Sequence, residues 1–144
     1  MSVDPEVKPF NNANKYFFYN DPIKGMFDSL AKPEYKEIYA QHAKTLSEVK
    51  ERSGEYAYLF DAVEKMAEVL SLKCCLGVEI RQAYEAKNME VLTTIANELI
   101  PQIIEKVDAF YEAFMKQWHI DNKSFGFDVQ CIRIGGVKQR LVYV

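Results

Sequence analysis

Apolar residues recur every three or four positions along most of the chain, which is the spacing of packed α-helices. The first such stretch runs from Pro33 to about Arg52. Its apolar face consists of Tyr35, Ile38, His42, Leu46 and Val49. Proline suits a first helical turn, and Ser53-Gly54 predicts the end of the helix because glycine accepts the left-handed backbone conformation.

The most regular pattern extends from Glu55 to about Lys87 and predicts a single helix. Its stripe, interrupted only at Lys73, consists of Leu59, Val63, Met66, Leu70, Gly77, Ile80 and Tyr84. At ~1.5 Å per residue this helix would be roughly 50 Å long, with a bend allowed near Gly77.

A further helix is expected after Asn88, which is a suitable cap. Its apolar stripe consists of Leu92, Ile95, Leu99, Ile103, Val107, Phe110, Phe114 and Trp118. Pro101 lies inside this helix, where it removes an amide donor and clashes with the carbonyl of Asn97. We therefore expect a kink there.

The N-terminal end of the chain lacks the helical period. Residues 1–14 are polar and rich in asparagine, which predicts an irregular lead-in. Residues 15–19 form an aromatic run, interpreted as an extended segment laid across the helices, with an edge strand as the alternative. Asp21 and Pro22 after it suit the cap and first position of a short helix.

The C-terminal stretch from Phe125 to Ile134 alternates as a strand does. Gly135-Gly136 then permits either a hairpin turn with a return strand over 137–144 or a helix that begins at Val137. The expected fold is therefore mainly α: an antiparallel three- to four-helix bundle with an extended N-terminal segment and a short C-terminal strand or loop. Residues 15–144 are expected to form a single domain.

Composition narrows the classes of partner. The 144 residues carry a net charge of −3, and the basic side chains are dispersed among acidic ones, unlike a nucleic-acid-binding surface. The three cysteines, of which Cys74 and Cys75 are adjacent, do not resemble a secreted disulfide framework. No apolar run reaches the ~20 residues that cross a bilayer. We expect a cytoplasmic protein with no nucleic-acid or membrane partner.

The sequence offers no constellation for chemistry. A di-iron bundle needs Glu-x-x-His, but Tyr39 and Lys116 stand three residues before His42 and His119. The adjacent cysteines point about 100° apart on a helix and are interpreted as structural thiols, not zinc ligands. His42 lies on the apolar face and is expected to be a core or interface residue. We expect no catalytic residue, no metal ligand and no cofactor.

Two segments resemble a known family. They are YFFYNDPIKGMFD (16–28) and NKSFGFDVQCIRIGG (122–136), the latter followed by Arg140, and residues 70–84 between them are also similar. They resemble the region after the catalytic barrel in a bacterial branch of glycoside hydrolase family 20, the β-N-acetylhexosaminidases. The resemblance covers the chain from about Asn14 to Arg140.

That family is known for a (β/α)8 barrel that removes terminal N-acetylhexosamine by means of an adjacent Asp-Glu pair. The chain contains no Asp-Glu dipeptide and no alternating βα pattern, so no catalytic residue carries over. The resemblance implies a fragment of a larger enzyme: a non-catalytic accessory domain attached to the catalytic barrel of the same polypeptide. The aromatic segments near the two ends of the chain suggest the hypothesis that this domain packs against the barrel, stabilises it and takes part in subunit contacts within a homodimer. The candidate interdomain contacts are Tyr16, Phe17, Tyr19, Asn20, Asp21, Trp118, Asn122, Phe125, Phe127, Arg133 and Arg140.

Two alternatives from other classes stay open. A free-standing interaction module would bind a partner helix through an exposed apolar helix face. A small-molecule binder would instead hold its ligand in a cavity between helices.

Overall fold

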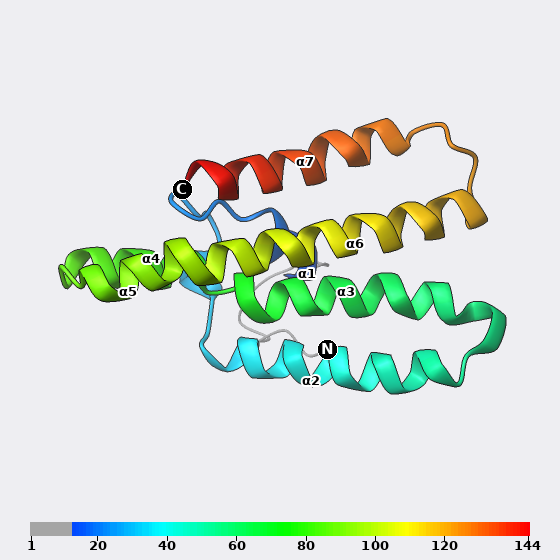
Figure 1. Ribbon diagram of the computed structural model, residues 1–144, viewed down its shortest axis with the longest axis horizontal. Helices are drawn as coiled ribbons and strands as arrows, with labels where there is room; N and C mark the ends of the chain where they lie inside the picture. Colours follow the sequence, from blue (N-terminus) through cyan, green and yellow to red (C-terminus); the bar gives the residue numbers. More distant parts are fainter. Residues whose placement is uncertain (1–12) are drawn as a thin grey trace.

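The computed structural model describes residues 13–144, and every regular element in this range is a helix (Figure 1). The elements are α1 (Ala13–Tyr19), the short turn η1 (Asp28–Leu30), α2 (Glu34–Glu51), η2 (Gly54–Tyr56), α3 (Ala57–Lys73), α4 (Leu76–Glu85), α5 (Met89–Thr94), the π segment η3 (Ile95–Leu99), α6 (Ile100–Asp121) and α7 (Phe127–Tyr143). The mainly helical class is confirmed. The lead-in expected over 1–14 lies outside the described residues, except for residues 13 and 14, which begin α1.

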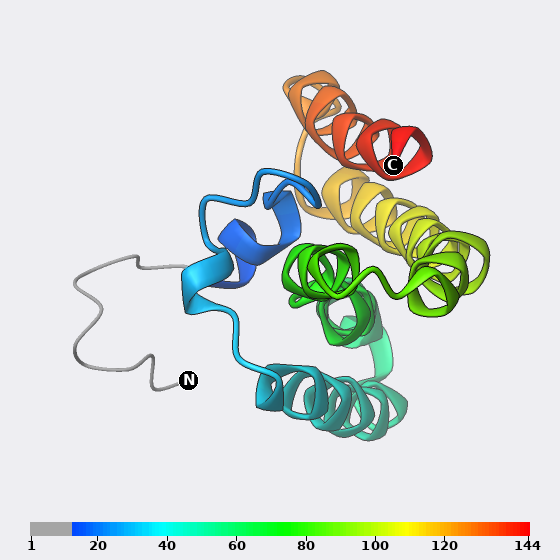
Figure 2. The same ribbon diagram turned by 90° about the vertical axis from the view of Figure 1, so that its left-hand side faces the viewer.

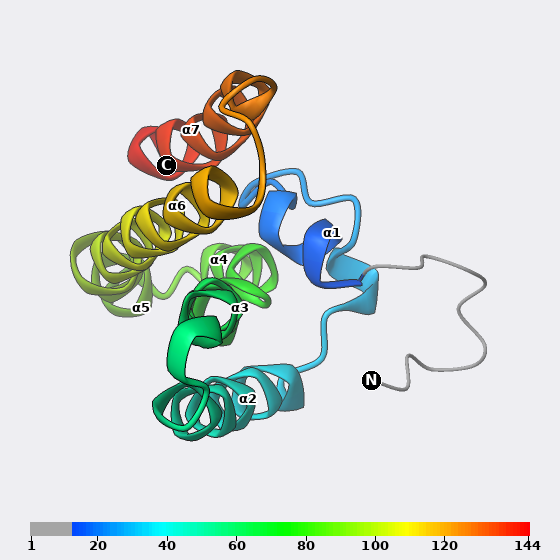
Figure 3. The same ribbon diagram turned by 90° about the vertical axis from the view of Figure 1, so that its right-hand side faces the viewer.

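The four long helices lie side by side in the order α7, α6, α3, α2, and neighbours alternate in direction (Figure 1). The short helix α1 packs on α3 from one side of this row, as the two side views show (Figures 2 and 3). Helices α4 and α5 form a hairpin that extends beyond the end of the row. Helix α3 therefore has neighbours on three sides, whereas α7 stands at the edge.

The core lies where α1, α3, α6 and α7 meet. Its most deeply buried side chains are Phe18, Val69, Leu70, Leu76, Ile103, Val107 and Leu141. The Phe18 and Phe110 rings meet edge to face, with their centroids 5.2 Å apart. A helix as short as α1 is marginal alone, so its aromatic side chains stabilise it by entering this core.

The extended N-terminal segment is wrong, because the aromatic run forms α1. The Oδ1 atom of Asp21 accepts the backbone N–H groups of Ile23 and Lys24 at 2.8 and 2.9 Å, the hydrogen bonds that a helix cap would make. The residues that follow form bends, however, and not the short helix expected after Pro22. The side chain offers the backbone an alternative to a helix there.

The C-terminal strand is also wrong, because α7 begins at Phe127 and runs through both glycines. Its buried residues are Phe127, Ile134, Val137 and Leu141, a helical spacing that packs on α6. The alternative prediction of a helix was correct in type, but it placed the start of the helix at Val137 instead of Phe127. The strand-like alternation of Phe127 and Val129 gave way to this helical set, because tertiary packing overrides local preference.

The single long helix over 55–87 is divided into α3 and α4 at Cys74 and Cys75. Both cysteines are buried, and the Cys75 thiol donates to the carbonyl oxygen of Lys32 at 3.3 Å. The chain therefore breaks just before Gly77, where only a bend was expected.

In α2, the predicted bounds are confirmed, and Gly54 after it has a φ of +54°. The interpretation of His42 as a core or interface residue is wrong with respect to the core, because its side chain is exposed. Tyr39 is the buried residue of α2 instead. The helix lies at the edge of the row and buries only a narrow face, so the flank of its apolar stripe remains in water.

The helix after Asn88 begins as expected, because the Asn88 side chain accepts the N–H of Val91 at 3.1 Å. The disturbance expected at Pro101 takes the form of the π segment η3, which directly precedes α6. A π turn widens the helix where the regular hydrogen-bond ladder is interrupted.

Candidate functional site

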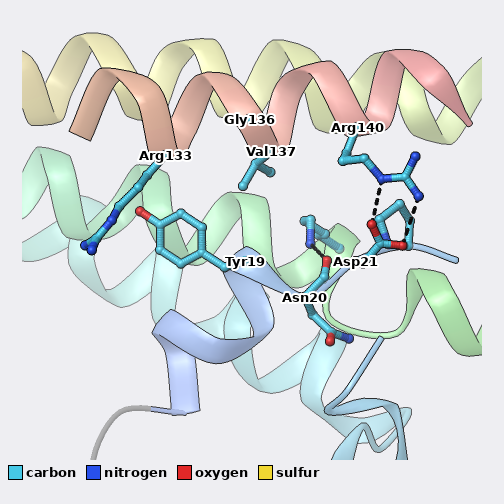
Figure 4. A pocket seen from close by; sticks show the side chains of 9 residues that line it. Tyr19, Asn20, Asp21, Arg133, Gly136, Val137 and Arg140 are labelled. Atoms are coloured by element: carbon cyan, nitrogen blue, oxygen red, sulfur yellow. Dashed lines mark hydrogen bonds and ion pairs between the residues drawn. The ribbon is translucent and has the colours of Figure 1, made fainter. Parts of the chain in front are cut away.

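A polar pocket opens between α7 and the segment that follows α1 (Figure 4). Its volume is about 210 Å³. Residues 19–22 form one wall and α7 the other, and Lys73 from the end of α3 also lines it. The pocket thus joins parts of the chain that are far apart in the sequence.

Lys73 is a charged residue with only 4% of its surface exposed. Its Nζ donates hydrogen bonds to the carbonyl oxygens of Phe17 and Asn20, at 3.2 and 2.6 Å. The last carbonyls of a helix have no partner within it, and a positive charge is favourable there. The ammonium group therefore holds the C-terminal end of α1, which explains the one interruption in the apolar pattern of α3.

Burial lowers the pKa of Lys73 from 10.5 to about 8, because loss of water disfavours the charged form. The negative charges of Asp21 and Asp28 act in the opposite direction. The side chain is therefore a cation at neutral pH.

An ion pair joins the two walls of the pocket. Arg140 donates from Nε to Asp21 Oδ2 at 2.6 Å and from Nη2 to Oδ1 at 3.2 Å (Figure 4). This guanidinium, followed by the backbone N–H groups of Lys24 and Ile23, holds the pKa of Asp21 well below its usual range, although burial opposes the effect. The charges of Asp21 and Arg140 therefore balance each other.

Arg133 has no such counterion. No hydrogen bond or ion pair joins it to another of the residues 13–144. Its side chain lies near Tyr19 (Figure 4). Burial raises the pKa of Tyr19, and the positive charge of Arg133 partly offsets that rise. Three cations and one carboxylate line the pocket, which gives it a surplus of positive charge in a chain whose net charge is −3.

Asn20 is fixed in the pocket wall by Asp28. Its Nδ2 donates to Asp28 Oδ1 at 2.6 Å, and its Oδ1 accepts the N–H of Phe27 at 3.2 Å. Asp28 also forms an ion pair with Arg81 of α4. A Cβ at Gly77 would lie 3.1 Å from the Asp28 carboxylate, so glycine lets α4 approach this closely. The wall is thereby anchored to α4.

The pocket brings together several of the predicted interdomain contacts, namely Tyr19, Asn20, Asp21, Arg133 and Arg140. Two others lie in α1. Phe17 is buried in the core, and Tyr16 is half-buried with its ring 4.7 Å from that of Phe27. Phe17 therefore has little surface left for another domain.

The remaining predicted contacts surround the turn from α6 to α7. Phe127 is buried against Trp118, with ring centroids 5.7 Å apart, and Trp118 donates from Nε1 to the carbonyl oxygen of Lys123 at 3.0 Å. Asn122 is exposed at the end of α6, and Phe125 is 93% exposed. Of the three aromatic residues, Phe125 alone is fully available to a partner.

Sequence reasoning missed the outer face of α7, which comprises Val129, Ile132, Gly136 and Tyr143 on the side away from α6. Ile132 and Tyr143 are 75% and 74% exposed. The spacing of these residues, three, four and seven positions, is a helical stripe opposite the buried one. The helical stripe is not recognised when residues 125–134 are interpreted as a strand.

Gly135 and Gly136 lie in the middle of α7. A glycine inside a helix costs about 1 kcal/mol relative to alanine. A Cβ added at either position meets nothing within 4 Å, so packing in the described part of the chain does not require a glycine there. Because glycine has no side chain, another domain can approach the backbone of α7 closely at these two positions.

The described residues contain no group of three or more His, Cys, Asp and Glu side chains placed to hold a metal ion. None of the helices in 13–144 is long and apolar enough to pass through a membrane. A family model described as the Glycoside Hydrolase 20C C-terminal domain matches residues 2–144. No curated protein sequence matches the chain.

The buried ammonium group predicts a specific effect of pH on stability. With a pKa near 8 in the folded chain and 10.5 when solvated, Lys73 holds fewer protons in the folded than in the unfolded chain between those values. Its contribution to the free energy of unfolding therefore rises with pH across this range and is lost as pH falls. The difference in unfolding free energy between the wild type and Lys73→Met should move in favour of the wild type by about 2 kcal/mol from about pH 7.5 to about pH 9.5.

Urea unfolding of both proteins at the two pH values measures this change. Burial raises the pKa values of the Cys74 and Cys75 thiols, and both thiols are present in the two proteins compared. Lys44→Met, at an exposed position of α2, is the control for the loss of a lysine side chain. A constant difference for Lys73→Met would show that this lysine titrates as it does in water.

Proposed function

The chain belongs to the family of glycoside hydrolase 20C C-terminal domains, and on this basis we propose that it is the non-catalytic accessory domain of a β-N-acetylhexosaminidase. A C-terminal domain of this family implies a catalytic domain on the same polypeptide. We propose that the chain packs against that catalytic barrel through the outer face of α7 and stabilises it. The removal of terminal N-acetylhexosamine is then the work of the barrel alone.

The observation that carries this proposal is the exposed apolar surface along α7. Phe125, Ile132 and Tyr143 are each at least 74% exposed and belong to one helix and the turn before it. Several large apolar side chains exposed on one side of a helix are typical of an interaction site. Burial of one such side chain contributes about 1.5–3 kcal/mol. Because the two domains share a polypeptide, the loss of translational freedom on docking is small.

Apolar residues are also exposed elsewhere. Tyr84 and Met89 lie at the tip of the α4–α5 hairpin, and Met26 lies in the loop after α1. Exposed apolar side chains that are scattered over a surface are normal on proteins. Helix α7 differs because its exposed apolar residues follow helical spacing at the edge of the row, where a partner can replace the missing neighbour.

The chemistry of the pocket supports a non-catalytic role. Glycoside hydrolysis needs a general acid whose pKa lies near the working pH. Asp21 is the carboxylate that lines the pocket, and Arg140 holds its pKa far below that range. It therefore stays ionised and paired, and cannot donate a proton to a leaving group.

Family membership favours the accessory domain over the free-standing interaction module, although both would use the same helix face. A second copy of the chain is the other candidate occupant of the outer face of α7, as in the expected homodimer. Sedimentation of the isolated chain distinguishes this alternative, because self-association that Ile132→Asp abolishes would assign the face to a subunit contact.

Substitution of an outer-face residue tests the proposed docking. In the complete enzyme, Ile132→Asp should shorten the half-life of thermal inactivation at least several-fold, because a buried carboxylate without a partner is costly. Activity on a chromogenic N-acetylglucosaminide, followed during heating, measures this. Tyr84→Asp is the matched control, since Tyr84 is 75% exposed, as Ile132 is, and lies on α4 away from α7. Equal half-lives for the two variants would contradict docking through α7.

The glycines of α7 offer a test in which two effects have opposite signs. Gly136→Ala should stabilise the isolated chain by up to about 1 kcal/mol, because alanine favours the helix and its Cβ meets nothing. The same methyl group lies at the centre of the outer face, so it should weaken docking in the complete enzyme. Urea unfolding measures the first effect, and the inactivation half-life measures the second.

Gly135→Ala is the control for this pair. Gly135 lies one position away, on the flank of α7, and also has open space at its Cβ. Gly135→Ala should raise the unfolding free energy of the isolated chain by the same amount as Gly136→Ala. It should shorten the inactivation half-life of the complete enzyme less. If Gly136→Ala stabilises both proteins equally, no backbone approaches α7 at that point.

A further inference from the structure

We propose that the pocket between α1 and α7 receives a carboxylate of the catalytic domain, an Asp or Glu side chain that pairs with Arg133 when the outer face of α7 is docked. This inference rests on the proposed function. It adds the polar contact that fixes how the two domains are oriented.

The pocket and the outer face of α7 adjoin each other. Gly136 belongs to both, and Arg133 and Arg140 flank the outer face on the side of the pocket. The guanidinium of Arg140 also lies over the ring of Tyr143, 4.9 Å from its centroid. A domain seated on the outer face therefore covers the mouth of the pocket as well.

Covering the pocket removes water from charges that are not balanced. Asp21 is already bound in a two-point contact by Arg140, so it is not available to Arg133. Lys73 is already buried, and its ammonium group donates to two backbone carbonyls, so Arg133 is the group that docking deprives of water. A charge taken out of water without a partner is strongly unfavourable. Docking through α7 therefore requires a negative group from the partner at Arg133.

The shape and charge of the pocket favour a carboxylate. A guanidinium presents parallel N–H donors that match the two oxygens of a carboxylate, as Arg140 and Asp21 show two helical turns away. Tyr19 lies beside Arg133 and can donate its hydroxyl proton to the same group. The Asp21 carboxylate in the wall repels a doubly charged phosphate more than a singly charged carboxylate. A space of about 210 Å³ accommodates one side chain.

The complete enzyme provides the test. A site for a sequence-specific protease is inserted between the catalytic domain and this domain, so that after cleavage the interface alone holds them together. The dissociation constant is measured at about 50 mM and about 500 mM NaCl. For the wild type it should rise about tenfold with salt, since the contact is an ion pair.

Arg133→Gln should raise the dissociation constant about tenfold at low salt and abolish its salt dependence. Arg133→Lys should retain part of the wild-type affinity and part of the salt dependence, because lysine keeps the charge but not the paired donors. Arg133 is exposed, so the substitution leaves the fold intact, which circular dichroism checks. Arg52→Gln is the matched control, because it removes the same charge at an exposed position at the end of α2. Ile132→Asp, measured in parallel, reports on docking itself.

The outcomes separate the two proposals. If Ile132→Asp weakens the complex and Arg133→Gln behaves like Arg52→Gln, the carboxylate contact is wrong and the docking face stands. If Ile132→Asp has no effect, the proposed function fails and this inference fails with it. Malonate, added at constant ionic strength, should weaken the wild-type complex and leave the Arg133→Gln complex unchanged. If malonate binds the isolated chain through Arg133 but Arg133→Gln does not affect docking, the pocket serves a free carboxylate and the assigned occupant is overturned.

Discussion

Helix α3 is enclosed by α1, α2 and α6, and this enclosure limits what the remaining helices can do. Val69 and Leu70 of α3 are almost completely inaccessible to water. Because α1, α2 and α6 already cover α3, α7 packs chiefly on α6, at the edge of the row (Figure 1). A helix with one long neighbour buries one stripe and exposes the opposite one. The apolar outer face of α7 follows from this arrangement.

The pocket follows from the same arrangement. Helix α1 lies beside α3, and its C-terminal carbonyls meet the ammonium group of Lys73. The chain then passes under α7, where Asp21 is held by Arg140. The interaction that anchors α1 therefore also places polar groups beside an apolar surface. Charged and apolar surfaces in contact are the normal composition of an interface between domains, with an apolar centre and a polar rim.

Much of this structure could be predicted from the sequence, because long helical periods are reliable signals. The α2 bounds, the Asn88 cap and the disturbance near Pro101 all follow from local chemistry. The errors lie where a short segment depends on distant partners. Phe17 and Phe18 are helical because the core and Lys73 hold them, and Phe127 begins a helix because α6 covers its stripe. Arg133 and Arg140 were selected through the family resemblance, whereas Ile132 and Tyr143 were missed, since their exposure depends on which face of α7 meets α6.

The accessibility of α7 to a small reactive probe tests the central claim most directly. Carbene footprinting, read by mass spectrometry, is applied to the isolated chain and to the complete enzyme. The account predicts that Phe125, Ile132 and Tyr143 are labelled strongly in the isolated chain and protected in the enzyme, while Ile38 and Tyr84 are labelled equally in both. Equal labelling of Ile132 and Tyr143 in the two proteins would show that α7 does not face the catalytic domain.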